Sequence, residues 1–120
     1  MEFLNKVQIR GVVGRNNVIT IADRRHFNMS VITQYSYKSK NNEPILESTW
    51  FLVVGFESPN TEAAINLKKG DAVEVTGRLR IRMHTVSNTD VEPRRVVEVV
   101  AQEVKRLDEG VSLPQTGEGD

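Results

Sequence analysis

The sequence predicts an all-β protein, a five-stranded antiparallel barrel of Greek-key topology with one short helix between strands 3 and 4. Two observations support this fold class. Apolar and polar residues alternate at a period of two along most of the chain, which is typical of strands with one buried face. Helix signals occur in a single segment, after the third long strand. The 120 residues are enough for one domain with a small core.

The alternation defines the strands in order. The first contains LNKVQIRGVV, where Val7 and Ile9 share a face, and the Gly-Arg-Asn-Asn segment at 14–17 is a predicted turn. VITIAD, HFNMSVITQYSYKSK and LESTWFLVVGFE are extended segments rich in β-branched or aromatic residues. In DAVEVTGRLRIRMH, the apolar residues from Val73 to Met83 lie on one side. In VVEVVAQEVKRL, the alternation slips near Ala101, which predicts a β-bulge.

The segment SPNTEAAINLKKG (58–70) is the predicted helix, about two turns long. Ser58 or Asn60 is expected to cap its start, and Gly70 suits the left-handed position after its end. Ala63 and Leu67 are one turn apart and are expected to face the core. Three long strands, a short helix and two more strands are the order of a barrel of the OB type.

The formal net charge of zero conceals an uneven distribution. Residues 1–40 carry seven basic and two acidic side chains, residues 41–107 nine and ten, and residues 108–120 none and four. We expect one folded, mildly basic domain over 1–107 and a short, acidic, flexible tail over 108–120. Such a domain suits a polyanion bound through one face, but not binding by charge alone.

The composition also excludes several classes of protein. No apolar run approaches the roughly 18 residues of a membrane span, and MEFLNKVQIRG does not resemble a secretion signal. The chain has no cysteine, His26 and His84 have no metal-ligand spacing, and GVVG at 11–14 does not lead into a helix. We therefore expect a cytoplasmic protein that is not an enzyme and uses no metal or cofactor.

The stretch GRLRIRMH (77–84) places basic side chains at every second position. Arg78, Arg80, Arg82 and His84 point to one side, about 6.5–7 Å apart, close to the phosphate spacing of a stretched single strand. Guanidinium groups bind phosphate and also stack on bases. The alternative is a solvent-facing strand whose arginines pair with glutamates such as Glu47, Glu74 or Glu98. Taken alone, the strand favours this simpler alternative.

The few aromatic residues strengthen a nucleic-acid interpretation. Tyr35 and Tyr37 share a face that leads into a lysine-containing loop at 38–46, and Trp50 and Phe56 share a face of the next strand. Exposed rings beside arginines form a platform on which stacking contributes about 1–3 kcal/mol per base. Alternatively, Trp50 and Phe56 are core residues. The alternation alone leaves both possibilities open.

Four segments together resemble the bacterial single-stranded DNA-binding proteins. They are NKVQIRGVVG, STWFLVVGF, NLKKGDAVEVTGRLRIR and VVEVVAQEVKRL, and the resemblance covers about residues 5–107. It implies an OB-fold that binds single-stranded DNA without strong sequence preference. It also implies a homo-oligomer, usually a tetramer with a dimer as the alternative, acting near the nucleoid in replication, recombination or repair.

The resemblance places stacking aromatics at four positions, and so selects the platform interpretation for Trp50 and Phe56. The expected stacking residues are Tyr37, Trp50, Phe56 and His84. The expected phosphate-neutralising residues are Arg10, Lys38, Lys40, Arg78, Arg80 and Arg82. The loops at 38–46 and 85–93 are expected to fold over the bound strand.

Two departures from the family pattern bear on partners. Phe51 stands where the family has a histidine near the subunit interface, and the chain ends QTGEGD without the family's long linker and Ile-Pro-Phe tip. We therefore do not expect the tail to recruit repair enzymes. The alternatives are a primosomal or conjugative accessory OB protein, an RNA-binding protein, and an OB-type structural module that mediates protein contacts.

Overall fold

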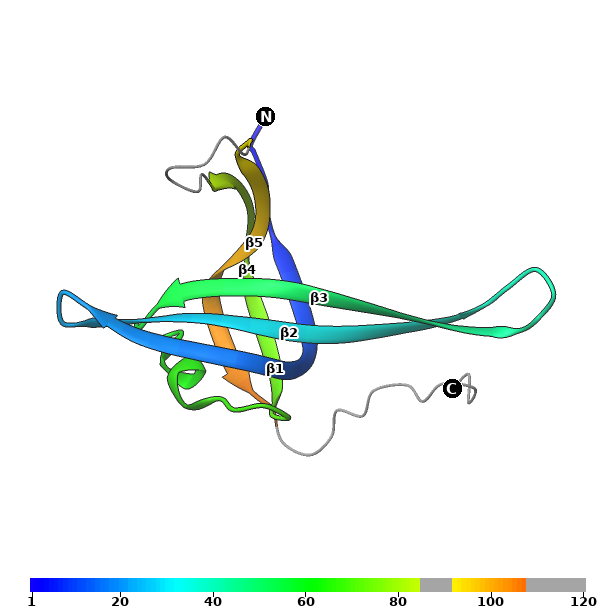
Figure 1. The fold of residues 1–120 in the computed structure, drawn as a ribbon, viewed down its shortest axis with the longest axis horizontal. Coiled ribbons are helices and arrows are strands. Elements are labelled where there is room, and N and C mark those ends of the chain that lie inside the picture. Colours follow the sequence, from blue (N-terminus) through cyan, green and yellow to red (C-terminus); the bar gives the residue numbers. More distant parts are fainter. Residues whose placement is uncertain (85–91, 108–120) are drawn as a thin grey trace.

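The computed structural model describes residues 1–84 and 92–107, which form a closed five-stranded barrel (Figure 1). Its elements are β1 (Val7–Ile21), β2 (Arg24–Lys38), β3 (Pro44–Phe56), the 3₁₀ helix η1 (Glu62–Asn66), β4 (Ala72–His84) and β5 (Arg94–Arg106). The predicted fold class is confirmed, with the helix between strands 3 and 4. Most of the predicted loop at 85–93, and all of the predicted tail at 108–120, lie outside the described residues.

The strand order around the barrel is β1-β2-β3-β5-β4. All neighbouring strands are antiparallel except β3 and β5, which run parallel through the pairs Val53–Val99 and Val54–Val100. β1 closes the barrel because it pairs with β4 in its first half and with β2 in its second half. This change of partner depends on Gly11, since a Cβ there would stand 2.2 Å from the Ile32 carbonyl oxygen.

The core lies inside the barrel and is built mainly from β-branched side chains. Its most deeply buried members include Val13, Met29, Val31, Val53, Val73, Val75 and Val99. Each strand contributes alternate residues to this core, as the period of two predicts. η1 covers one end of the barrel with Ala64, and Leu67 follows it into the core.

The predicted turn at 14–17 is wrong, because β1 runs through this segment to Ile21. Gly14 falls at a register shift between Val13 and Arg15, so the segment is an irregularity within the strand. The chain reverses instead at Ala22 and Asp23, both with positive φ, in a tight two-residue hairpin. As a result, residues 17–21 extend the sheet, and three of them line a groove on the outside of the barrel.

The bulge predicted near Ala101 is confirmed. Gly77 pairs with Ala101 while Thr76 pairs with Glu103, so Gln102 is the extra residue of β5. The bulge adjoins a close approach of the two backbones, where a Cβ on Gly77 would stand 2.2 Å from a carbonyl oxygen of β5. Beyond this point, β4 and β5 leave the barrel as a two-stranded ribbon (Figure 1).

η1 is shorter than predicted, and its cap differs. It is a single 3₁₀ segment preceded by Thr61, and its cap position makes no side-chain hydrogen bond, so the predicted cap at Ser58 or Asn60 is wrong. The Thr61 hydroxyl instead donates to the Phe56 carbonyl oxygen at 2.7 Å. Gly70 has the predicted positive φ, of 94°. Thr61 therefore fixes the chain where β3 ends.

The β4–β5 ribbon corrects one expectation about burial. Leu79, Ile81 and Met83 continue the side of β4 that carries Val73, but they are 41–57% exposed because the ribbon extends past the core. The Asn5 side chain bonds both the N–H and the carbonyl of Leu79, at 2.8 and 2.7 Å, which holds the N-terminal segment beside β4.

Within the described residues, no helix is long and apolar enough to cross a membrane.

Candidate nucleic-acid interface

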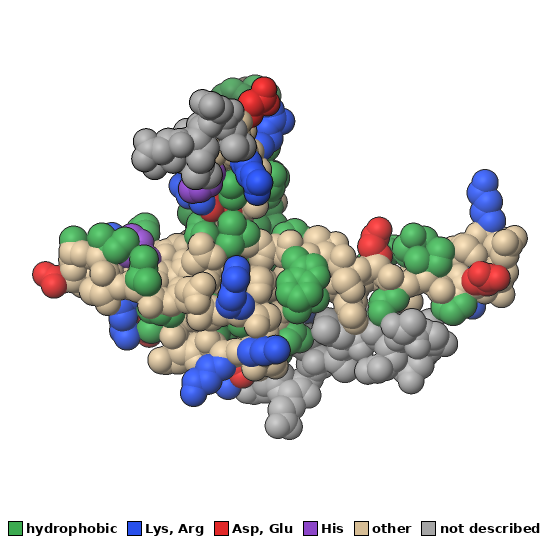
Figure 2. Space-filling model, in the orientation of Figure 1, with side chains coloured by type: hydrophobic (Ala, Val, Ile, Leu, Met, Phe, Trp, Pro, Cys, Tyr) green, Lys and Arg blue, Asp and Glu red, His purple; other side chains and the backbone are tan. Residues whose placement is uncertain are grey.

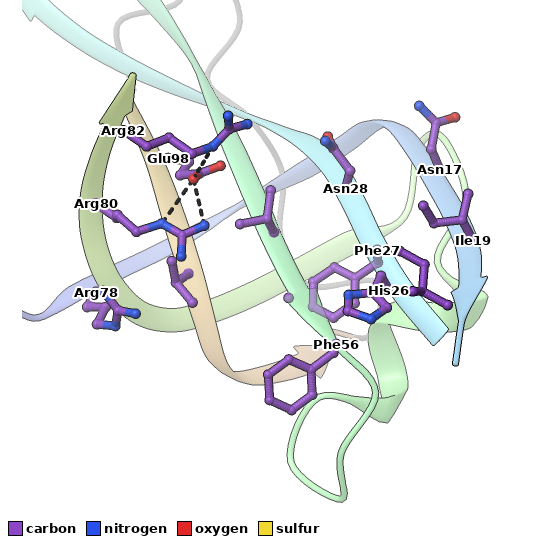
Figure 3. Close-up of a pocket in the computed structure, with 14 residues that line it drawn as sticks. Asn17, Ile19, His26, Phe27, Asn28, Phe56, Arg78, Arg80, Arg82 and Glu98 are labelled. Carbon is purple, nitrogen blue, oxygen red and sulfur yellow. Dashed lines mark hydrogen bonds and ion pairs between the residues drawn. The ribbon is translucent and has the colours of Figure 1, made fainter. Parts of the chain in front are cut away.

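A groove of about 600 Å³ lies between the β4–β5 ribbon and the outer face of β1, β2 and β3. Arg78, Arg80 and Arg82 follow one another along one side of it, and Phe56 and His26 lie on the other (Figure 3). We name these sides the basic wall (Arg78, Arg80, Arg82) and the aromatic wall (His26, Phe56). The groove therefore combines cations with flat rings, which are the two kinds of group that bind single-stranded nucleic acids.

The basic wall results from the pairing of β4 with β5. Arg78, Arg80 and Arg82 pair with Val100, Glu98 and Val96, and alternate residues of a strand point to the same side. The sequence interpretation that these arginines share a face is therefore confirmed. The side chains of Arg80 and Arg82 are 41% and 43% exposed, so both reach solvent.

One carboxylate interrupts the basic wall. Glu98 is 1% exposed, and its Oε1 accepts hydrogen bonds from Arg80 Nε at 3.0 Å, Arg80 Nη2 at 2.7 Å and Arg82 Nε at 2.7 Å. Its Oε2 is buried and has no hydrogen-bond partner among the described residues. Arg78 forms no ion pair within the described part of the chain. The alternative interpretation, arginines paired with Glu98, is thus also right for two of the three arginines.

The aromatic wall centres on Phe56, whose side chain is 45% exposed. The Arg24 guanidinium carbon lies 4.4 Å from the centroid of its ring, a cation–π contact, and the His26 ring lies 6.2 Å away, tilted by 59°. Arg25 forms a two-point ion pair with Glu57, which joins the start of β2 to the end of β3. The hydrogen bond from Arg25 lowers the pKa of the Glu57 carboxyl.

Trp50 lies outside the groove but on the same side of β3 as Phe56, six residues away. Its side chain is 64% exposed, and its ring extends over β2 until Cζ3 is 3.2 Å from where a Cβ of Gly14 would be. The alternative that Trp50 and Phe56 are core residues is therefore wrong. Figure 2 shows Lys and Arg side chains beside hydrophobic ones on the face that includes β1 to β3.

Tyr37 lies on the opposite side of the β2–β3 ribbon from Trp50. Trp50 pairs with Ile32 and Tyr37 with Ile45, and paired residues share a side while residues five apart do not. The Tyr35 and Tyr37 rings are 5.8 Å apart on the part of the ribbon that projects from the barrel (Figure 1). The structure therefore does not bring Tyr37 together with Trp50 in one platform within a single protomer.

The remaining predicted residues also lie outside the groove. Lys38 and Lys40 are exposed at the tip of the β2–β3 ribbon, and His84 is exposed at the end of β4. Arg10 pairs with Glu74 across β1 and β4 at 2.5 Å, which lowers the pKa of the Glu74 carboxyl. The groove thus unites Phe56 with the three arginines of β4.

Sequence reasoning missed several groove residues on β1 and β2. Asn17 pairs with Asn28 and Ile19 with His26, and all four line the groove. They were missed because a turn was expected at 14–17, which removes residues 17–21 from the sheet.

Within residues 1–84 and 92–107, no group of three or more His, Asp or Glu side chains is arranged to hold a metal ion.

A closed five-stranded barrel with a groove of arginines and aromatics is typical of OB-fold proteins that bind single-stranded nucleic acids. Residues 4–107 match the sequence profile of the Single-strand binding protein family. The chain belongs to the Single-strand binding protein family.

Two solved structures share the fold. A Plasmodium falciparum SSB in complex with ssDNA aligns with a TM-score of 0.77 and 21% identity, covering 90% of this chain and 98% of that one. A deletion mutant of the single-stranded DNA binding protein from Thermus aquaticus aligns with a TM-score of 0.73 and 20% identity. That alignment covers 89% of this chain and 52% of the Thermus chain, so this chain spans about half of it.

Proposed function

We propose that this chain binds single-stranded DNA without strong sequence preference and protects it during replication, recombination or repair. The observation that carries the proposal is the groove in which Arg78, Arg80 and Arg82 face Phe56. Guanidinium groups neutralise phosphates, and a ring stacks on any base because every base has a π face. The role is binding and not catalysis, in keeping with the family.

Phe56 and Trp50 define the proposed direction of the strand. They lie six residues apart on one side of β3, which is about 20 Å along this β-strand. A few extended nucleotides of DNA span the same length. A single strand that stacks on Phe56 inside the groove can therefore continue to Trp50 outside it. Both rings are exposed on the side that receives the bases.

The predicted residues outside the groove have a place in this proposal as contacts of a longer strand. Tyr37, Lys38 and Lys40 are available where the strand follows the β2–β3 ribbon, and His84 where it leaves the basic wall. Arg10 is the weakest member of the set, because it already pairs with Glu74. These residues add contacts around the central groove, and do not replace it.

We also propose that the chain assembles with itself, as a tetramer or a dimer. The support is the apolar side of the β4–β5 ribbon, where Leu79, Ile81, Met83 and Val97 are 41–57% exposed. Contiguous exposed apolar side chains commonly mark contact surfaces between proteins. The proposed location is the cytoplasm, at the DNA of the nucleoid.

The test is a titration with oligo(dT) and with duplex DNA of equal length, at two salt concentrations. We expect the single strand to bind more tightly than the duplex, and its affinity to fall as salt rises because counterions are released from the phosphates. A structural module that mainly mediates protein contacts would show no salt-sensitive oligo(dT) binding. Stronger binding of a matched RNA oligomer would favour the RNA-binding alternative, because the backbone 2′-OH is the main difference.

A further inference from the structure

Glu98 lies within the basic wall, at the position where the proposed function calls for cations. It pairs with Arg80 across β4 and β5, and Figure 3 shows its carboxylate between the guanidinium groups of Arg80 and Arg82. Within residues 1–84 and 92–107, the three hydrogen bonds that it accepts come from these two arginines, and all three fall on Oε1. A buried anion thus faces the two cations that would meet a phosphate.

A buried carboxylate is tolerated only when it is paired and hydrogen-bonded, because it has lost the solvation of water. Glu98 meets this condition through three charge-assisted donors, the stronger class of hydrogen bond. Together with Glu98, Arg80 and Arg82 therefore form a group with a net charge of one, whereas the two arginines alone would carry two positive charges. Glu98 also fixes their position, since it holds Nε of both side chains.

The two arginines are held unequally. Arg80 donates through Nε and Nη2, whereas Arg82 donates through Nε alone. Within the described residues, neither terminal nitrogen of Arg82 bonds to Glu98, and both side chains stay more than 40% exposed. The guanidinium groups can therefore still receive a phosphate while Glu98 holds them.

We propose that Glu98 is a positioning residue that acts as an internal substitute for a phosphate. It holds Arg80 and Arg82 on the wall of the groove and cancels one of their charges, so the groove neutralises about one phosphate fewer than its arginines allow. This inference rests on the function proposed above. Its consequence is a weaker and less salt-sensitive grip on DNA, which lets a bound strand leave or shift more easily.

The experiment measures how the oligo(dT) affinity of the full chain varies with salt. Each phosphate neutralised on a single strand adds about −0.7 to the slope of log K against log salt. Glu98→Gln keeps the shape of the side chain and removes the charge, so we expect a slope steeper by about 0.7 and tighter binding at low salt. This difference corresponds to about a five-fold larger loss of affinity for each ten-fold rise in salt.

The matched control is Glu103→Gln, which removes one negative charge from β5, as Glu98→Gln does. Glu103 lies outside the groove and its side chain is 46% exposed. If Glu98→Gln and Glu103→Gln have the same slope, the inference is overturned. If the unmodified chain and Glu103→Gln do not bind oligo(dT) at all, the proposed function fails instead.

A second pair of variants covers the case in which Glu98→Gln does not fold. Arg80→Met is compared with the double variant Arg80→Met with Glu98→Met, since replacing a buried ion pair by apolar residues is often tolerated. We expect the double variant to have the steeper slope, by about 0.7, because Arg82 then keeps its full charge. Equal slopes in the two variants would show that Glu98 cancels no charge at the groove.

Discussion

The guanidinium of Arg24 covers one face of the Phe56 ring, with its central carbon 4.4 Å from the ring centroid. Phe56 also lines the groove, on the wall that faces the arginines of β4 (Figure 3). A base that stacks on the face of Phe56 that Arg24 leaves uncovered would extend a stack that Arg24 has already begun. The contact also places a cation behind the ring, which suits a negatively charged ligand.

Phe56→Leu should weaken oligo(dT) binding, because leucine fills part of the same volume but offers no π face. The expected loss is about 1–3 kcal/mol, the usual contribution of one stacked base. Fluorescence anisotropy of a labelled oligomer measures it. Phe3→Leu is the matched control, since Phe3 is 92% exposed and lies outside the groove. Equal affinities for the two variants would remove Phe56 from the interface.

The fluorescence of Trp50 should be quenched when oligo(dT) binds. Trp50 is the one tryptophan of the chain and its side chain is 64% exposed, so the signal reports this position alone. Stacking with a base changes the emission of an indole directly. A titration that saturates by anisotropy but leaves the emission spectrum unchanged would show that the strand does not reach Trp50.

Glu57 should make the fold sensitive to acid. The hydrogen bond from Arg25 lowers its folded-state pKa below the unfolded value of about 4.3. A lowered pKa stabilises the fold above the unfolded value, and that contribution is lost as pH falls through the folded value. We expect the drop in melting temperature between pH 5 and pH 3 to be smaller in Glu57→Gln. Glu47→Gln, which removes a glutamate without an ion pair among the described residues, should keep the full drop.

Ile81→Glu should reduce self-association, because it places a charge in the middle of the exposed apolar side of the β4–β5 ribbon. Light scattering measures the mass of the assembly. Tyr35→Glu adds the same charge at an equally exposed position on the β2–β3 ribbon, and should leave the mass unchanged. If Ile81→Glu keeps the mass of the unmodified chain, the subunits meet through another surface.

The barrel could be predicted from the sequence because its strands alternate regularly, and the side that each arginine of β4 occupies follows from the same period. The burial of each residue could not be predicted from this alternation, because the alternation indicates which side of the strand a residue is on but not whether another layer covers that side. Leu79 and Ile81 therefore share the side of the core residues and yet lie exposed. The hairpin turn at Ala22 and Asp23 could not be predicted, because its two positions of positive φ are not occupied by the Gly or Asn residues that usually mark such a turn.

The site was predictable in its chemistry and less so in its geometry. Whether Arg80 is paired or available depends on the register that places Glu98 opposite it, and register is a long-range property. The same holds for Tyr37 and Trp50, whose sides of the ribbon are set by how β2 and β3 align. Residue type at a given strand position therefore indicated the ligand class, whereas the contacts required the fold.

The parallel pairing of β3 with β5 forms a seam of the barrel that, like the pairing of β1 with β4, joins strands distant in the chain and is needed for closure. Contacts of such long range form slowly, so this seam is expected to complete late in folding. The groove has one wall on each side of the seam, and it exists only after closure. A strand of DNA that touches both walls would then hold the finished barrel shut, and its melting temperature would keep rising with the concentration of DNA above the dissociation constant.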